Sequence, residues 1–99
     1  MTLHILFESP FAGHCLDECR RVAQTGDALL LVGDGVYALA GTQAAALAAL
    51  RAAGVEMFAL GEDCAARGID VHATDSVTAL DYAGFVGLAL AHERSVSWF

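Results

Sequence analysis

Basic side chains are scarce in this sequence of 99 residues. Five arginines stand against twelve acidic residues, and the formal net charge is −7. Affinity for nucleic acids comes largely from Lys and Arg side chains that contact phosphates. Five basic residues are too few for such a footprint, so the composition argues against direct binding to DNA or tRNA. The same shortage disfavours the anionic surface of a membrane.

Several targeting and scaffold features are also missing. No stretch approaches the ~20 consecutive apolar residues that a membrane-spanning helix needs. Met1–Phe7 has no basic region of the kind that begins a signal peptide. Three cysteines are an odd number without the spacing of a disulfide scaffold, which suits a reducing compartment. We therefore expect a cytoplasmic protein.

The sequence offers no pattern that predicts a metal ion or a cofactor. The four histidines are scattered, and no two of them lie one helical turn apart in a pattern that would suggest zinc. The segment from Gly33 to Ala38 formally matches the dinucleotide-binding pattern G-x-G-x-x-G/A. However, the next good helix start is Thr42, and Glu56 lies at the beginning of a strand, where it could not hold a ribose. We interpret the two glycines as a tight turn.

What the sequence has in excess is apolar residues. Hydrophobic residues make up 57% of the chain and charged residues only 17%. A small domain has proportionally more surface to cover with polar groups, so this excess predicts that part of the apolar surface is buried against other subunits. The two aromatic residues Trp98 and Phe99 either fold back onto the domain or bury themselves in a neighbour.

Apolar spacing predicts alternating strands and helices. The expected strands are Leu3–Phe7, Ala28–Val32, Val55–Leu60, a brief one at Val71–Ala73 and a last one at Ser95–Trp98. The expected helices are His14–Thr25, Thr42–Ala53, Glu62–Arg67 and Ser76–Ala91. Such alternation implies right-handed crossovers and a mainly parallel sheet with helices on both faces. We predict a single three-layer α/β domain over residues 1–99.

Cys19 is the best candidate for a reactive side chain. It stands beside Arg20 and Arg21, and neighbouring cations favour the thiolate, which is the reactive form of a thiol. The negative charges of Asp17 and Glu18 disfavour the thiolate. Cys19 also falls on the apolar stripe of its predicted helix, and free cysteine is among the most buried residue types, so a core position is the alternative. Cys15 and Cys64 are interpreted as structural.

Across its length the chain resembles the DsrH/TusB proteins of sulfur-relay complexes. The resemblance rests on short motifs that occur in the family's order and spacing. They are Leu3-His4, Ser9-Pro10-Phe11, Asp34-Gly35-Val36, Asp63, Ala66-Arg67-Gly68, Asp81-Tyr82, Phe85-Val86 and Trp98. The resemblance implies a compact α/β fold related to the DsrE/DsrF-like proteins.

It further implies assembly with DsrE/TusD-type and DsrF/TusC-type subunits into a heterohexamer. Such complexes take sulfane sulfur from a TusA-type donor, hold it as a cysteine persulfide and pass it to a DsrC/TusE-type acceptor. The sulfur serves tRNA 2-thiouridine synthesis in TusB-type organisms and sulfur oxidation in DsrH-type organisms. The expected role is that of a sulfur carrier or sulfurtransferase subunit rather than a stand-alone enzyme.

The resemblance also bears on Cys19, which occupies a position where DsrH-type members have a cysteine. It therefore implies that Cys19 is a candidate persulfide carrier. In the family the best-established sulfur-carrying cysteine belongs to the DsrE/TusD-type subunit, so the alternative is a non-catalytic structural subunit of the same heterohexamer.

Overall fold

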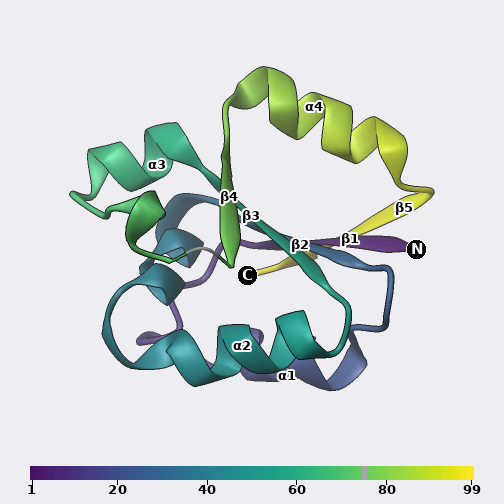
Figure 1. Cartoon of the computed structure of the whole chain (residues 1–99), viewed down its shortest axis with the longest axis horizontal. Coiled ribbons are helices and arrows are strands. Elements are labelled where there is room, and N and C mark those ends of the chain that lie inside the picture. Colours follow the sequence, from purple (N-terminus) through teal and green to yellow (C-terminus); the bar gives the residue numbers. More distant parts are fainter. Residues whose placement is uncertain (75) are drawn as a thin grey trace.

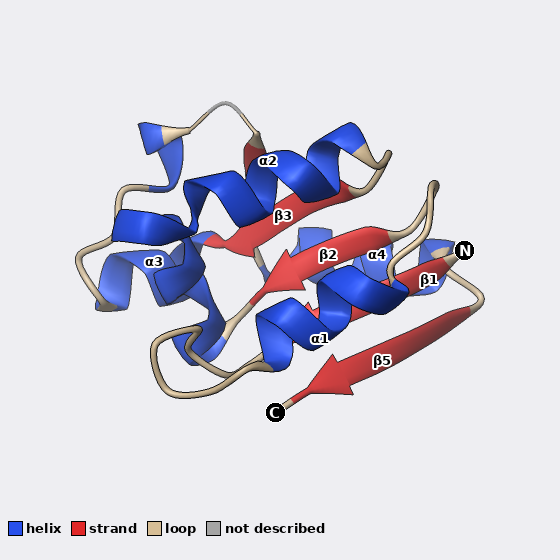
Figure 2. Ribbon diagram, turned by 90° about the horizontal axis from the view of Figure 1, so that it is seen from below, coloured by secondary structure: helices blue, strands red, loops and turns tan. Residues whose placement is uncertain are grey.

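The computed structural model describes residues 1–74 and 76–99, which form a parallel β-sheet flanked by helices (Figures 1 and 2). The sheet has five strands in the order β4-β3-β2-β1-β5. Their bounds are β1 Thr2–Leu6, β2 Ala28–Leu31, β3 Glu56–Leu60, β4 Val77–Leu80 and β5 Arg94–Trp98. Every pairing is parallel. The predicted fold class, an α/β fold with helices on both faces of a mainly parallel sheet, is confirmed.

The helices are divided unequally between the two faces of the sheet. Helices α1 (Cys15–Val22) and α2 (Ala44–Ala52) cover one face, whereas α4 (Tyr82–Ala91) crosses the other face alone (Figure 1). A short helix, α3 (Gly61–Ala66), follows β3 directly. The described residues also include three 3₁₀ segments: η1 Gly33–Leu39, η2 Gly41–Gln43 and η3 Val71–Ala73.

The central strands are buried on both faces, as a parallel sheet requires. All four residues of β2 are buried, and their side chains alternate between two core clusters. Leu29 and Leu31 face α1 and α2 together with Leu6, while Leu30 faces α4 together with Leu3. The continuous apolar run in β2 therefore reflects burial on both sides. By contrast, β5 lies at an edge and is mostly exposed.

Two of the predicted elements are wrong. Ser76–Ala91 does not form one helix, because Val77–Leu80 pairs with β3 as strand β4 and the helix begins only at Tyr82. The break falls at Asp81, whose carboxylate accepts a hydrogen bond from the Gly84 amide over 2.8 Å. Val71–Ala73 is a 3₁₀ turn rather than a strand, because the Asp70 carboxylate caps it through the amide of His72.

The start of α2 also differs from the prediction. Thr42 lies in η2, and α2 begins at Ala44 without a side-chain cap. The predicted end is confirmed, since Gly54 follows the helix with a φ of +88°, a conformation that favours glycine. Among the described residues, no helix is both long enough and apolar enough to cross a membrane.

Candidate functional site

The thiol of Cys19 lies in the core between α1 and the sheet. Its side chain has no exposed surface and belongs to the cluster that contains Leu16 and Leu29. Burial, followed by the charges of Asp27 and Cys15, raises the pKa of the Cys19 thiol to about 12. At that pKa only roughly one molecule in 10⁵ carries the thiolate at neutral pH. In this conformation the sulfur has no surface from which to attack a donor.

The two arginines next to Cys19 in sequence do not activate it. Consecutive residues of a helix point about 100° apart, so Arg20 and Arg21 lie on the solvent side of α1. Arg20 pairs there with Asp17, with 3.4 Å between Nη1 and Oδ1. Both arginines line a groove of about 390 Å³ between α1 and α2. Leu50 lines the same groove and packs in the core cluster of Cys19.

Cys15 is the most accessible of the three thiols and stands at the first position of α1. Its Sγ donates a hydrogen bond to the carbonyl oxygen of Phe99 over 2.9 Å, and its amide donates to Oε1 of Glu8 over 3.1 Å. The pKa of the Cys15 thiol is raised, first by burial, then by the hydrogen bond and charge of Glu8, and last by the charge of Glu18. The thiol therefore acts as a hydrogen-bond donor that holds α1 against the end of β5. Cys64 is buried, in agreement with its structural interpretation.

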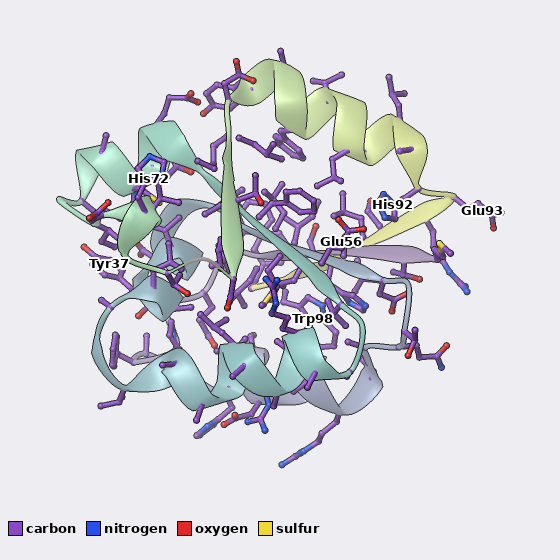
Figure 3. The ribbon with its side chains drawn as sticks, viewed as in Figure 1. Tyr37, Glu56, His72, His92, Glu93 and Trp98 are labelled. Atoms are coloured by element: carbon purple, nitrogen blue, oxygen red, sulfur yellow. The ribbon has the colours of Figure 1, made fainter. Side chains whose placement is uncertain are left out.

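The two aromatic residues at the end of the chain differ in how far they pack against the domain. The rings of Phe7 and Phe99 stack with 4.8 Å between their centroids. Trp98 lies on the side of the sheet that faces α1 and α2 and packs against the core there (Figure 3). Trp98 therefore folds back onto its own domain, whereas Phe99 stacks on Phe7 and remains 78% exposed.

A buried polar network links three residues that the sequence did not bring together. His4 Nε2 lies 3.0 Å from Oδ2 of Asp27, and Trp98 Nε1 donates to Nδ1 of His4 over 3.2 Å. Asp27 also accepts hydrogen bonds from the amides of Thr2 and Gln24. Burial alone raises the pKa of Asp27, but these two amides and His4 together lower it to about 2. An ionised Asp27 thus joins β1 to the turn after α1, and His4 extends the network to Trp98 in β5.

A second cluster forms at the carboxyl ends of β2 and β3, from the motif residues noted in the sequence. The Asp63 carboxylate accepts a hydrogen bond from the Gly33 amide over 2.6 Å. Arg67 binds Asp34 through its guanidinium, with 3.0 Å between Nη2 and Oδ1. These contacts fasten η1 to α3. A Cβ at Gly35 would collide with the carbonyl oxygen of Leu6, so this position of the turn requires glycine.

This geometry argues against a phosphate loop at Gly33. The amide of Gly33 already donates to a carboxylate, and the amide of Gly35 donates to the carbonyl of Val32. The segment that follows is 3₁₀ rather than the start of an α-helix, so it provides no helix N-terminus for an anion. Within the described ranges 1–74 and 76–99, no three His, Cys, Asp or Glu side chains gather in a way that could hold a metal ion.

The fold is shared with solved α/β structures. The ychN protein from E. coli superimposes with a TM-score of 0.76, covering 98% of this chain and 97% of that one at 15% identity. A protein from Methanobacterium thermoautotrophicum superimposes with a TM-score of 0.70, covering 97% and 96% at 14% identity. At such low identity these likenesses establish the fold alone.

Sequence comparisons identify the family. Residues 8–95 match the family model described as DsrH like protein. Protein TusB of Sodalis glossinidius is 38% identical over 97 residues, which cover 97% of this chain and 99% of that protein. Protein TusB of Salmonella enteritidis is 40% identical over 79 residues, which cover 79% and 81%. The chain belongs to the DsrH/TusB family, as the motifs predicted.

Proposed function

We propose that this chain is a subunit of a cytoplasmic sulfur-relay complex. The proposal is supported by family membership that extends over residues 8–95. The curated relatives carry the name TusB, which favours a role in tRNA 2-thiouridine synthesis over one in sulfur oxidation. With a net charge of −7 the chain is suited to contact other proteins of the relay rather than the tRNA itself.

The proposed partners are DsrE/TusD-type and DsrF/TusC-type subunits in a heterohexamer, with a TusA-type donor and a DsrC/TusE-type acceptor. Exposed large apolar side chains support a subunit role. Phe11 is 60% exposed and Val22 is 53% exposed, on the side of the molecule that carries α1. Aromatic residues are enriched in the buried centres of protein interfaces, so Phe11 is a candidate contact for such a partner.

Within the complex, the geometry best supports a structural subunit that does not itself carry sulfur. The single observation behind this choice is the complete burial of Cys19. Sulfur transfer needs a thiolate that can reach the sulfane sulfur of the donor. Neither condition is met by a buried thiol with a pKa of about 12. The side chain instead contributes packing between α1 and the sheet.

A carrier role for Cys19 is the second candidate, favoured by the groove between α1 and α2. This groove shares Leu50 with the core around Cys19, so a partner that separated the two helices there would expose the thiol. The Cys19 thiolate would then attack the terminal sulfur of the donor persulfide. A new S–S bond forms on Cys19, the donor's S–S bond breaks, and the donor cysteine leaves as a thiolate. An acceptor thiolate would remove the terminal sulfur by the same exchange.

Mass spectrometry of the reconstituted complex separates the two roles. The complex is incubated with a persulfidated TusA-type donor, and each chain is examined for a gain of about 32 Da, one sulfur atom. The structural role predicts no gain in mass on this chain. It also predicts that a complex with Cys19→Ala delivers sulfur to the acceptor at an unchanged rate. The carrier role predicts a gain in mass on this chain that disappears in Cys19→Ala. The gain should persist in Cys64→Ala, which replaces a second buried cysteine and serves as the control. Delivery at the full rate by a complex that lacks this chain would overturn the subunit proposal itself.

Alkylation tests the accessibility of Cys19 directly. A small thiol reagent should modify Cys15 in the folded chain and reach Cys19 and Cys64 only after denaturation, because the latter two are buried. If Cys19 in the assembled complex reacts as fast as Cys15, the structural interpretation of Cys19 fails.

A further inference from the structure

Helix α4 is apolar on the side that faces solvent as well as on the side that faces the sheet. Its sequence from Tyr82 to Ala91 contains no charged residue, and none of its residues is buried. Val86 is 57% exposed and Leu90 is 82% exposed, and with Tyr82 they stand four residues apart along one stripe. A helix that is hydrophobic all round normally lies in a core. Figure 1 shows α4 as the outermost element on its side of the sheet.

Gly87 leaves an open space on the exposed side of this helix. Glycine in the middle of a helix costs about 1 kcal/mol relative to alanine, so the chain needs a reason to keep it. That reason is not found within the described residues: setting aside the helix's own backbone and the adjacent residues, a Cβ at Gly87 would meet nothing within 4 Å. The backbone conformation does not require glycine either, since φ at this position is not positive. The missing side chain leaves room for an atom from outside the chain.

The order of large and small residues on α4 is complementary to itself. Tyr82, Val86 and Leu90 are large, whereas Ala83, Gly87 and Ala91 are small. When two copies of the helix pack antiparallel about a two-fold axis between positions 86 and 87, each large residue meets a small one. Leu90 lies over Ala83 of the second copy, Val86 over Gly87, and Tyr82 over Ala91. Isologous contacts of this kind are typical of symmetric dimers.

Electrostatics allow a second copy to approach at α4, although they oppose it elsewhere on the surface. Two copies of a chain with a net charge of −7 repel one another over most of their surface. On α4 they can meet without bringing carboxylates of the helix together, and antiparallel helices place opposite dipole ends side by side. The pairing also brings Asp81 at the start of one α4 next to His92 at the end of the other. Glu93 points away from this face (Figure 3).

We propose that α4 is a self-association surface whose occupant is α4 of a second copy of this chain. The proposal makes no use of sulfur chemistry and can fail while the relay function stands. A ten-residue helix is about 15 Å long, which is short compared with the interfaces of permanent dimers. We therefore expect a weak dimer, with a dissociation constant on the order of tens of micromolar.

Sedimentation of the isolated full chain tests this proposal. Between about 5 and about 500 µM the average mass should rise from that of one chain towards that of two. Val86→Glu should abolish the rise, because it places a charge at the centre of the contact. Val22→Glu is the matched control, since Val22 is a similarly exposed valine on α1, and it should dimerise as the wild type does.

Gly87→Leu separates the contact from the fold. The leucine has open space in the monomer and should raise the melting temperature, yet it fills the position that receives Val86 and should weaken dimerisation at least tenfold. A chain that stays monomeric throughout the concentration range overturns the proposal. So does dimerisation that Val86→Glu and Gly87→Leu both leave intact. If Val86→Glu blocks only the binding of a different subunit, that subunit is the occupant and the second copy is not.

Discussion

Trp98 donates a hydrogen bond from Nε1 to Nδ1 of His4 over 3.2 Å, and the two residues are 94 positions apart in sequence. The indole N–H can only donate, so Nδ1 of His4 is the acceptor. The proton of the neutral imidazole is therefore assigned to Nε2, where it points to Asp27 at 3.0 Å. The edge strand β5 is thus held to β1 by a side-chain network as well as by the backbone.

Replacing Trp98 by Phe should lower the free energy of unfolding by about 1–2 kcal/mol, because buried Nδ1 of His4 loses its donor while a ring is retained. Trp98 is the only tryptophan, so urea denaturation is better followed by far-UV circular dichroism than by fluorescence. Tyr82→Phe is the control, since it removes a polar group from an exposed ring and should leave stability unchanged. Identical urea midpoints for Trp98→Phe and the wild type would show that the hydrogen bond contributes nothing.

Asp27 should make the fold sensitive to acid. Its pKa is lowered from 3.8 to about 2 in the folded state. The native structure therefore stabilises the ionised form of Asp27. Its contribution to the free energy of unfolding is complete above the unfolded pKa and is lost as the pH falls towards 2. The shift corresponds to about 2 kcal/mol. Asp27→Asn should lower the free energy of unfolding by about this amount at pH 7. The difference in this free energy between Asp27→Asn and the wild type should shrink between pH 4 and pH 2.

Denaturation curves at a series of pH values measure this difference. Glu93→Gln is the control, because Glu93 is an exposed acidic residue that points away from the body of the molecule (Figure 3). It should follow the wild-type profile throughout. A constant gap between Asp27→Asn and the wild type from pH 7 to pH 2 would contradict the lowered pKa.

Two aspartates at the carboxyl end of the sheet should differ in their importance. Asp63 accepts a hydrogen bond from the Gly33 amide, whereas Asp34 makes an exposed ion pair with Arg67. Hydrogen bonds to charged acceptors contribute about 1.5–3 kcal/mol, and exposed ion pairs about 0–1 kcal/mol. Asp63→Ala should therefore destabilise the fold more than Asp34→Ala, as judged from urea midpoints. Equal losses would mean that the Gly33 contact is not the stronger of the two.

How far the sequence predicted this structure depends on the range of the interactions involved. β2 was recognisable because four successive apolar residues are buried on both faces of the sheet. The prediction of one helix over residues 76–91 is wrong, because the apolar residues of this segment fit a helix as well as a strand followed by a helix. Only the pairing of Val77–Leu80 with β3 separates the two elements. Local periodicity carries no information about such a pairing.

The candidate site shows the same limit. The position of Cys19 on the apolar stripe of its helix already indicated a core location, which the structure shows. Its adjacency to Arg20 and Arg21 was misleading, because neighbours in a helix point in different directions. The network of His4, Asp27 and Trp98 could not be foreseen from spacing. It depends on the register of β5 against β1, which places Trp98 beside Leu6 and one step diagonally from His4.

Gly35 and Gly87 should respond in opposite ways to the same substitution. A Cβ at Gly35 would collide with the carbonyl oxygen of Leu6, which is backbone of the central sheet and cannot move aside, whereas a Cβ at Gly87 meets open space. Gly35→Ala should therefore destabilise the fold by at least about 2 kcal/mol, as overpacking in a core does. Gly87→Ala should stabilise the dilute monomer by about 1 kcal/mol through helix propensity. Thermal denaturation at low protein concentration measures both, and a Gly35→Ala protein that melts at the wild-type temperature would show that η1 does not pack against β1 as closely as the structure indicates.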